Sequence, residues 1–124
     1  MLTAQLSVTV SPPKATGQKV VVPIAIKNDL LEKVESARAV LFLSDGQGKV
    51  VGQSAKWVIG GRQGSPGLAV GATNIFYFVV TSPLPLTSTN NLQSRIVFDR
   101  IVLESGKYAD PRKDVQIVVD SNRP

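Results

Sequence analysis

The sequence predicts an all-β protein folded as an antiparallel β-sandwich of about seven strands. Three observations support this prediction. Apolar residues alternate with polar ones in several segments, as they do in strands that bury one face. Turns rich in glycine and proline separate these segments. The chain has 124 residues, which fits a single domain over residues 1–124 with one two-layer core.

The first strand is predicted over residues 3–10. It ends at the Ser-Pro-Pro segment 11–13, because proline cannot donate to a β-ladder. Residues 14–19 predict a turn. The second strand, 19–27, contains Pro23, so we expect this proline on an edge strand or at a bulge.

The segment 28–36 predicts a connecting loop, and the third strand follows over 37–43. Asp29 could cap a short helix, with Glu32 three residues later, so one helical turn or a longer helix remains the alternative. The inward residues expected from the first three strands are Ala4, Leu6, Val8, Val10, Val20, Val22, Ile24, Ile26, Ala37, Ala39, Leu41 and Leu43.

A hairpin is predicted in the middle of the chain. Its turn covers 44–49, where Asp45-Gly46 would supply the unusual dihedral angles, and its second strand covers 50–59. The glycines of this hairpin do not make a phosphate-binding loop, because a strand rather than a helix follows them. The inward residues expected from the second strand are Val51, Ala55, Trp57 and Ile59.

Residues 60–67 predict an exposed, mobile loop, because they contain four glycines and a proline. The strand predicted over 72–81 is apolar on both faces. Such a strand is either central and covered or part of an interface. One face carries Phe76, Phe78 and Val80, and the other carries Ile75, Tyr77 and Val79.

Two further strands complete the predicted sandwich. A polar loop, 82–94, leads to a strand over 95–103, where Asp99-Arg100 breaks the alternation and predicts a one-residue bulge. A charged loop, 104–113, precedes the last strand at 114–119. The inward residues expected from that last strand are Val115, Ile117 and Val119.

Composition excludes several kinds of chemistry. The chain has no cysteine and no histidine, so it has no Cys/His zinc site, thiol nucleophile or histidine base. The formal net charge is +5, but the basic residues are scattered, which argues against nucleic acid as a partner. No apolar run is long enough for a membrane span. We expect residues 1–2 and 121–124 to fray.

Four groups of side chains are the candidate sites. Asp99 and Glu104 come nearest to a paired-carboxylate site, but a small sandwich offers little cleft. Glu104, Asp110 and Asp114 could gather around calcium, although no EF-hand pattern supports this. Tyr108 is the best candidate for an exposed ring. Trp57 is expected in the core. We therefore predict no catalytic, cofactor or metal site.

These seven predicted strands, without a clear helix, match an immunoglobulin-like sandwich. Segments 26–28 (Ile-Lys-Asn), 41–46 (Leu-Phe-Leu-Ser-Asp-Gly), 48–52 (Gly-Lys-Val-Val-Gly) and 70–76 (Val-Gly-Ala-Thr-Asn-Ile-Phe) resemble FxLYD-type immunoglobulin-like domains of bacteria. The likeness covers about residues 20–80, and its motifs are mostly hairpin and core positions. It implies an envelope or secreted module without catalysis and adds no active-site residue.

Two functional hypotheses follow. The first is a non-catalytic interaction or structural module that holds a protein partner, a neighbouring domain or a second copy of itself. The alternative is a domain that binds a carbohydrate or another anionic polymer, suggested by the basic balance and Tyr108. The chain shows no signal peptide, so it is either a cytosolic protein or a mature domain whose signal peptide has been trimmed. We expect the second, an extracytoplasmic location, because Met1 lies so close to the first strand.

Overall fold

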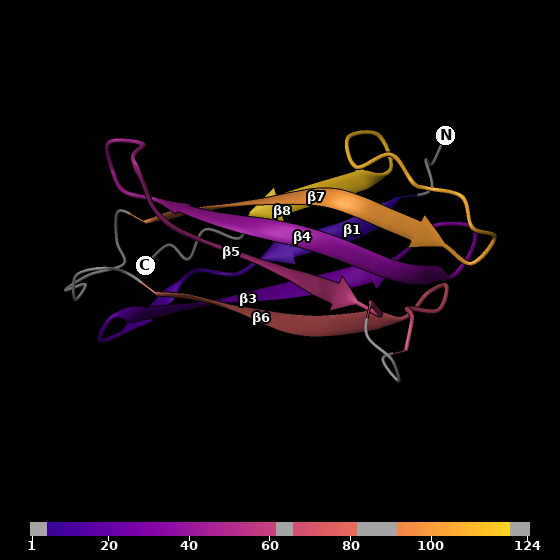
Figure 1. Ribbon diagram of the computed structural model, residues 1–124, viewed down its shortest axis with the longest axis horizontal. Helices are drawn as coiled ribbons and strands as arrows, with labels where there is room; N and C mark the ends of the chain where they lie inside the picture. Colours follow the sequence, from indigo (N-terminus) through magenta and orange to yellow (C-terminus); the bar gives the residue numbers. More distant parts are fainter. Residues whose placement is uncertain (1–4, 62–65, 82–91, 120–124) are drawn as a thin grey trace.

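The computed structural model describes residues 5–61, 66–81 and 92–119, and the described residues fold into strands and loops without a helix (Figure 1). None of their segments is a helix long and apolar enough to cross a membrane. The strands are β1 (Leu6–Val10), β2 (Lys14–Thr16), β3 (Lys19–Asn28), β4 (Val34–Ser44), β5 (Val50–Ile59), β6 (Thr73–Thr81), β7 (Gln93–Leu103) and β8 (Val115–Val119).

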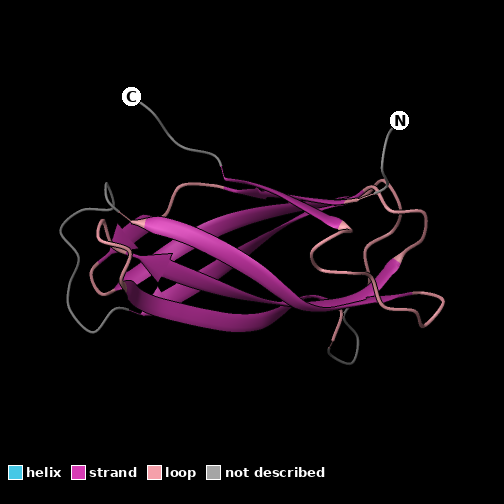
Figure 2. Ribbon diagram, turned by 90° about the horizontal axis from the view of Figure 1, so that it is seen from above, coloured by secondary structure: helices cyan, strands magenta, loops and turns pink. Residues whose placement is uncertain are grey.

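The strands form two sheets. In the large sheet, β1 and β2 pair with successive parts of one side of β3, β6 pairs with the other side, and β8 pairs with β1. The small sheet has the order β5-β4-β7. Figure 2 shows the two layers from above. The predicted all-β sandwich is therefore confirmed. One pair departs from the antiparallel pattern, because β8 runs parallel to β1.

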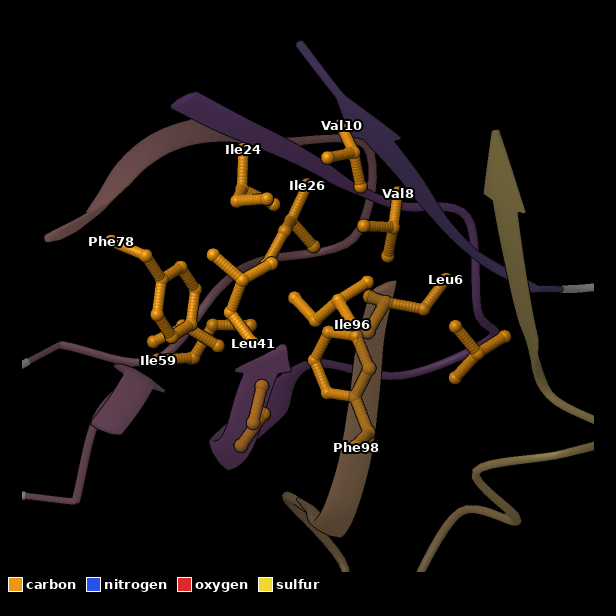
Figure 3. Close-up of a cluster of buried hydrophobic side chains, with 14 of the residues drawn as sticks. Leu6, Val8, Val10, Ile24, Ile26, Leu41, Ile59, Phe78, Ile96 and Phe98 are labelled. Atoms are coloured by element: carbon orange, nitrogen blue, oxygen red, sulfur yellow. The ribbon is translucent and has the colours of Figure 1, made fainter. Parts of the chain in front are cut away.

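The core lies between the inner faces of the two sheets. Side chains from β1 and β3 point toward those from β4 and β7, and Phe78 of β6 and Ile59 of β5 join them at one side (Figure 3). The alternation predicted for the first three strands is confirmed for every described residue. The large apolar side chains with almost no exposed surface are Phe78, Leu6, Ile24, Ile26, Leu41, Leu43, Ile101, Val8, Val10, Val20, Val22 and Val34.

Two predictions about the N-terminal half are wrong. Lys14–Thr16 forms β2, which pairs with the start of β3, so the turn is confined to the two residues between these strands. Pro23 lies in a strand paired on both sides rather than on an edge strand. Its carbonyl accepts from the backbone N–H of Ser11, just where the neighbour of β3 changes from β1 to β2. The missing proline N–H thus removes no regular ladder bond.

Asn28 organises the loop that follows β3. The loop prediction is confirmed over residues 29–33, which form neither a helix nor a helical turn. Asn28 is fully buried; its side-chain amide donates to the carbonyls of Glu32 (3.1 Å) and Leu68 (2.9 Å). Its side-chain oxygen accepts from the N–H of Leu30 (2.9 Å). Because these groups satisfy one another, a buried amide is tolerated here and fixes two loops against the strand.

The predicted hairpin is confirmed, but its details differ. Asp45 accepts the backbone N–H groups of Gln47 (2.9 Å) and Lys49 (3.0 Å) through one carboxylate oxygen. The positive φ is adopted by Gly48 (83°) and not by Gly46. The side chain of Asp45 therefore closes the turn, and the left-handed residue lies two positions later than predicted.

The predicted facing of β5 is wrong. Ala39, Leu41 and Leu43 of β4 are buried, and their partners on β5 are Lys56, Ser54 and Gly52. These partners face inward, whereas Ala55 and Trp57 face outward. Val51 lies at a register shift next to Gly52 and packs against the core, as predicted. The inner face of β5 is polar because β5 is an edge strand that meets the edge strand β6. A bulge at Val58 then changes the phase, so that Ile59 is buried as expected.

The last strand is less buried than predicted. Val115 is buried, but Ile117 and Val119 expose 39% and 52% of their surface. β8 ends the large sheet and pairs only with β1 among the described residues. Inward-facing side chains at this edge lie beyond the cover of the three-stranded sheet. The predicted fraying of residues 1–2 and 121–124, the position of Ala4 and much of the loops 60–67 and 82–94 fall outside the described residues.

Candidate functional site

The outer side of β6 exposes three large apolar side chains. Phe78 and Val80 point into the core, whereas Ile75, Tyr77 and Val79 expose 61%, 55% and 47% of their surface. In the described part of the chain, β6 pairs only with β3 and its outer face is uncovered. Their cross-strand partners on β3, Ala25, Pro23 and Val21, extend the same surface. We name these six residues the apolar stripe.

Lysines flank the apolar stripe. Lys14 is the cross-strand partner of Val21, and Lys19 and Lys27 lie at the two ends of the same face of β3. Lys27 forms an ion pair with Asp29 (Nζ to Oδ1 3.6 Å). Within the described part of the chain, no acidic side chain pairs with the other two lysines. The surface is therefore apolar at its centre and basic at its rim.

Lys56 occupies the seam where β5 and β6 meet. Its side chain points inward from β5, and its ammonium donates to the carbonyl of Tyr77 (3.0 Å). The same ammonium lies 5.6 Å from the centre of the Phe78 ring. An inward-pointing charge on an edge strand discourages pairing with another chain. The apolar stripe thus offers its side chains rather than its backbone edge as the contact surface.

The small sheet carries a different feature on its outer face. Two bulges flank Arg38: Val58 is the extra residue on β5, and Asp99 is the extra residue on β7. The bulge predicted at Asp99-Arg100 is therefore confirmed. An open cavity of about 350 Å³ lies here, and we name it the bulge pocket; it is lined by Arg38, Trp57, Asp99 and Arg100.

Trp57 lines this pocket instead of filling the core, which corrects the sequence-based expectation. It is half-buried on the outer face. Gly61 lies against its ring: a Cβ built at Gly61 would be 2.4 Å from the ring carbons Cγ and Cδ2. Gly61 also has a φ of +79°, a conformation that glycine adopts at little cost. The backbone at Gly61 therefore holds the indole in position.

Charges in the bulge pocket are partly balanced. Asp99 accepts a hydrogen bond from a terminal guanidinium nitrogen of Arg38, and both side chains are about 40% exposed. Arg100 is exposed and has no acidic partner among the described residues. Two arginines and one aspartate give the pocket a formal charge of +1. A second basic and aromatic pair, Arg95 and Phe42, lies farther along the same face.

Of the other predicted carboxylates, Asp110 and Asp114 hold a loop in place. Glu104 follows the end of β7 and does not join Asp99, so the structure does not bring this acid pair together. Asp114 accepts the N–H of Asp110 (2.8 Å), and Asp110 accepts the N–H of Arg112 (2.9 Å). Three or more potential metal-ligating side chains do not gather anywhere in residues 5–61, 66–81 and 92–119.

Tyr108 and Glu32 lie at one end of the sandwich. Tyr108 is 66% exposed, as predicted, beside the end of β7, where it bridges to Val102. Glu32 accepts the N–H of Ser105 (2.9 Å). The pKa of Glu32 is below its ordinary value, chiefly because of this hydrogen bond. A second hydrogen bond, from the Ser105 side chain, and the charge of Lys107 lower it further. The acid anchors the turn between β7 and Tyr108.

The sequence did not reveal the bulge pocket, because its pattern predicts that Trp57 of β5 faces the core, whereas Trp57 faces outward. The only available signal was the broken alternation at Asp99-Arg100, which was interpreted as a bulge without a binding role. The second bulge, at Val58, left no comparable break, because both Val58 and Ile59 are apolar and buried. Pairing of the two bulges around Arg38 became visible only with the strands in register.

Comparison with known proteins supports the fold and leaves the function open. No protein-family model matches the chain. A search of curated proteins likewise finds no match. Among solved structures, the chain is similar to the crystal structure of the "Putative ApaA Protein from Bordetella pertussis", with a TM-score of 0.58 and 19% identity over 87% of this chain and 89% of that one. At this identity the likeness concerns the fold alone.

Proposed function

We propose that this chain is a non-catalytic interaction module, an immunoglobulin-like domain of a bacterial envelope or secreted protein, that binds a protein partner through the apolar stripe. The observation that carries the proposal is the exposure of Ile75, Tyr77 and Val79 on one continuous sheet face. Large contiguous apolar surfaces of this kind typically mark interaction sites. The resemblance to FxLYD-type domains and the expected extracytoplasmic location form part of the same proposal.

Charge selects the kind of partner. Lys14 and Lys19 at the rim favour a protein surface, on another protein or a neighbouring domain, that is apolar at its centre and acidic around it. A homodimer through this face is less favourable, because the chain carries a formal net charge of +5 and would approach a copy of itself with the same sign. Nucleic acid is excluded from the proposal because it offers no apolar counterpart to the stripe.

The non-catalytic part of the proposal rests on the placement of the acids. Asp99 is paired with Arg38 on an open surface, and Glu104 lies beyond the end of β7. General acid–base work by two carboxylates needs both on one substrate. The separation of these acids therefore supports binding rather than catalysis.

A photo-crosslinking experiment tests the proposed function. A benzophenone amino acid replaces Tyr77 in the intact protein, in the cells that produce it, and irradiation is followed by mass spectrometry. We expect cross-links to an acidic segment of another protein or neighbouring domain. The matched control carries the same group at Phe42, on the opposite outer face, and should not form these cross-links. Absence of cross-links at position 77 would overturn the proposal, and cross-links to the same chain would replace the partner by a second copy.

A specific observation favours the alternative function, binding of a carbohydrate or anionic polymer. The bulge pocket combines an aromatic ring with two arginines on the opposite face of the sandwich. The two functions use separate surfaces, so one chain can perform both.

A further inference from the structure

We propose that the bulge pocket binds one acidic sugar unit of an anionic polysaccharide. The site lies on the outer face of the small sheet, and the inference rests on the alternative function proposed above, for which it names the ligand class. Its volume of about 350 Å³ is near the small end of the ~300–1,000 Å³ range of ligand pockets. It suits a single small ring better than an extended cofactor.

The backbone prepares this pocket before any ligand arrives. Both bulges meet at Arg38, one on each neighbouring strand. A bulge re-aims the side chains beside it, and bulges are frequent next to functional sites. Here they bring Trp57, Asp99 and Arg100 around one residue. Gly61 lies against the indole and restricts its movement, so that little conformational freedom is lost when a ligand binds.

The side chains offer what a charged sugar requires. The Trp57 indole supplies a flat apolar surface for the C–H face of a pyranose ring, and its N–H supplies a donor. Arg38 and Arg100 can donate several hydrogen bonds to a carboxylate or sulfate. Asp99 retains acceptor capacity beyond its bond to Arg38 and can accept from a hydroxyl. Donors, an acceptor and an aromatic ring in one place select a hydroxylated, negatively charged ring.

Asp99 is also the reason to favour a polysaccharide over other polyanions. Phosphodiesters and carboxylate side chains bring acceptors only, and a carboxylate in the site would repel them. A sugar acid brings hydroxyl donors together with its negative charge.

A second contact zone lies in line with the pocket. Phe42 and Arg95 are cross-strand partners on the same outer face. Phe42 is four residues from Arg38 along β4, which corresponds to about 13 Å at ~3.3 Å per residue. Val40 and Val97 lie between the two zones. A chain of sugars laid along the strands would reach both basic zones at once, and this raises affinity without a deeper pocket.

The chain offers an internal reporter for the test, because Trp57 is its only tryptophan. The protein is titrated with two acidic octasaccharides, one from heparin and one from alginate, while Trp57 fluorescence is recorded. We expect a saturable change with at least one of them and a weaker signal in higher salt. Maltooctaose, octaglutamate and an eight-nucleotide thymidine strand are the comparison ligands. No saturable change with either acidic sugar, or an equal change with octaglutamate or the DNA strand, would overturn the assignment.

Two charge-matched variants locate the binding. Arg100→Ala should weaken acidic octasaccharide binding at least tenfold, whereas Arg112→Ala, at an exposed arginine that does not line the pocket, should change it less than twofold. Equal losses in the two variants would show a non-specific charge effect and overturn the site. Tyr77→Ala should leave sugar binding unchanged. This last variant separates the two proposals, because loss of protein binding and loss of sugar binding then map to different faces.

Discussion

The two outer faces of this sandwich differ in kind, although the inner faces of both sheets contribute to one apolar core. The large sheet turns Ile75, Tyr77 and Val79 to solvent and encloses them with lysines. The small sheet turns Arg38 and Arg100 outward around a tryptophan. Burial of apolar area holds both sheets together and leaves their outer faces free to vary. The two proposed recognition surfaces therefore differ in their chemistry, although one scaffold carries both.

The strongest test of this comparison separates the two sides of β6. Phe78→Ala should lower the free energy of unfolding by about 4 kcal/mol, because the ring is fully buried and its loss leaves a cavity. Tyr77→Ala, the neighbouring exposed position, should cost less than about 1 kcal/mol. Chemical denaturation monitored by circular dichroism measures both. Similar losses would mean that the apolar stripe is covered within the folded chain.

The second prediction concerns the support of the bulge pocket. Gly61→Ala should destabilise the protein by about 3 kcal/mol, because the residue has a positive φ and its Cβ would strike the Trp57 ring. Displacement of the indole should also shift its fluorescence. Gly106→Ala is the matched control: its φ is +89° but no atom lies within 4 Å of the added Cβ, so about 1 kcal/mol is expected. An unchanged Trp57 spectrum in the first variant would contradict this account.

A third prediction sharpens the contrast between recognition and stability. Arg38→Ala and Asp99→Ala should each change the free energy of unfolding by less than about 1 kcal/mol, since the pair is about 40% exposed at both ends. A double-mutant cycle in denaturant measures their coupling. Coupling above about 2 kcal/mol would show that the pair stabilises the sheet, and this result would contradict a role confined to recognition.

The smallest effect is expected from Glu32, at the end of the sandwich away from both outer faces, and it concerns how stability depends on pH. The pKa of Glu32 is lowered because Ser105 donates to its carboxylate. A lowered pKa means that the charged acid favours the folded state. Its contribution is present above the ordinary glutamate pKa of ~4.3 and is lost as the pH falls through the lower folded value.

Carbon-13 NMR of the Glu32 carboxyl should therefore give a pKa below that of a model peptide, and the Ser105 amide shift should titrate with it. Glu32→Gln should abolish the acid-dependent shift at Ser105. A Glu32 pKa at or above its ordinary value would remove this anchor from the account of the loop.

Much of the fold could be predicted from local pattern. Alternation in β1, β3 and β4 correctly predicts which side chains are buried. These strands are paired on both sides and face the opposite sheet, so every second side chain is fully covered and must be apolar. The predicted phase was wrong for β5, whose inner face carries Ser54 and Lys56. At a sheet edge the inner face is only partly covered, so polar residues are tolerated there. The hydropathy of a residue then no longer indicates whether its side chain faces the core or the solvent. The same reason explains the exposed Ile117 and Val119 on β8.

The sequence by itself determined an all-β sandwich, its central strands, the hairpin at Asp45 and the bulge at Asp99, because each depends on residues close together in the chain. Only the tertiary structure decided that β6 is an edge strand, that β8 runs parallel to β1, and that Trp57 meets Arg38 and Arg100 on the outside. These features depend on which strands become neighbours and in which register. That choice is made by the packing of the whole core, and no single segment encodes it.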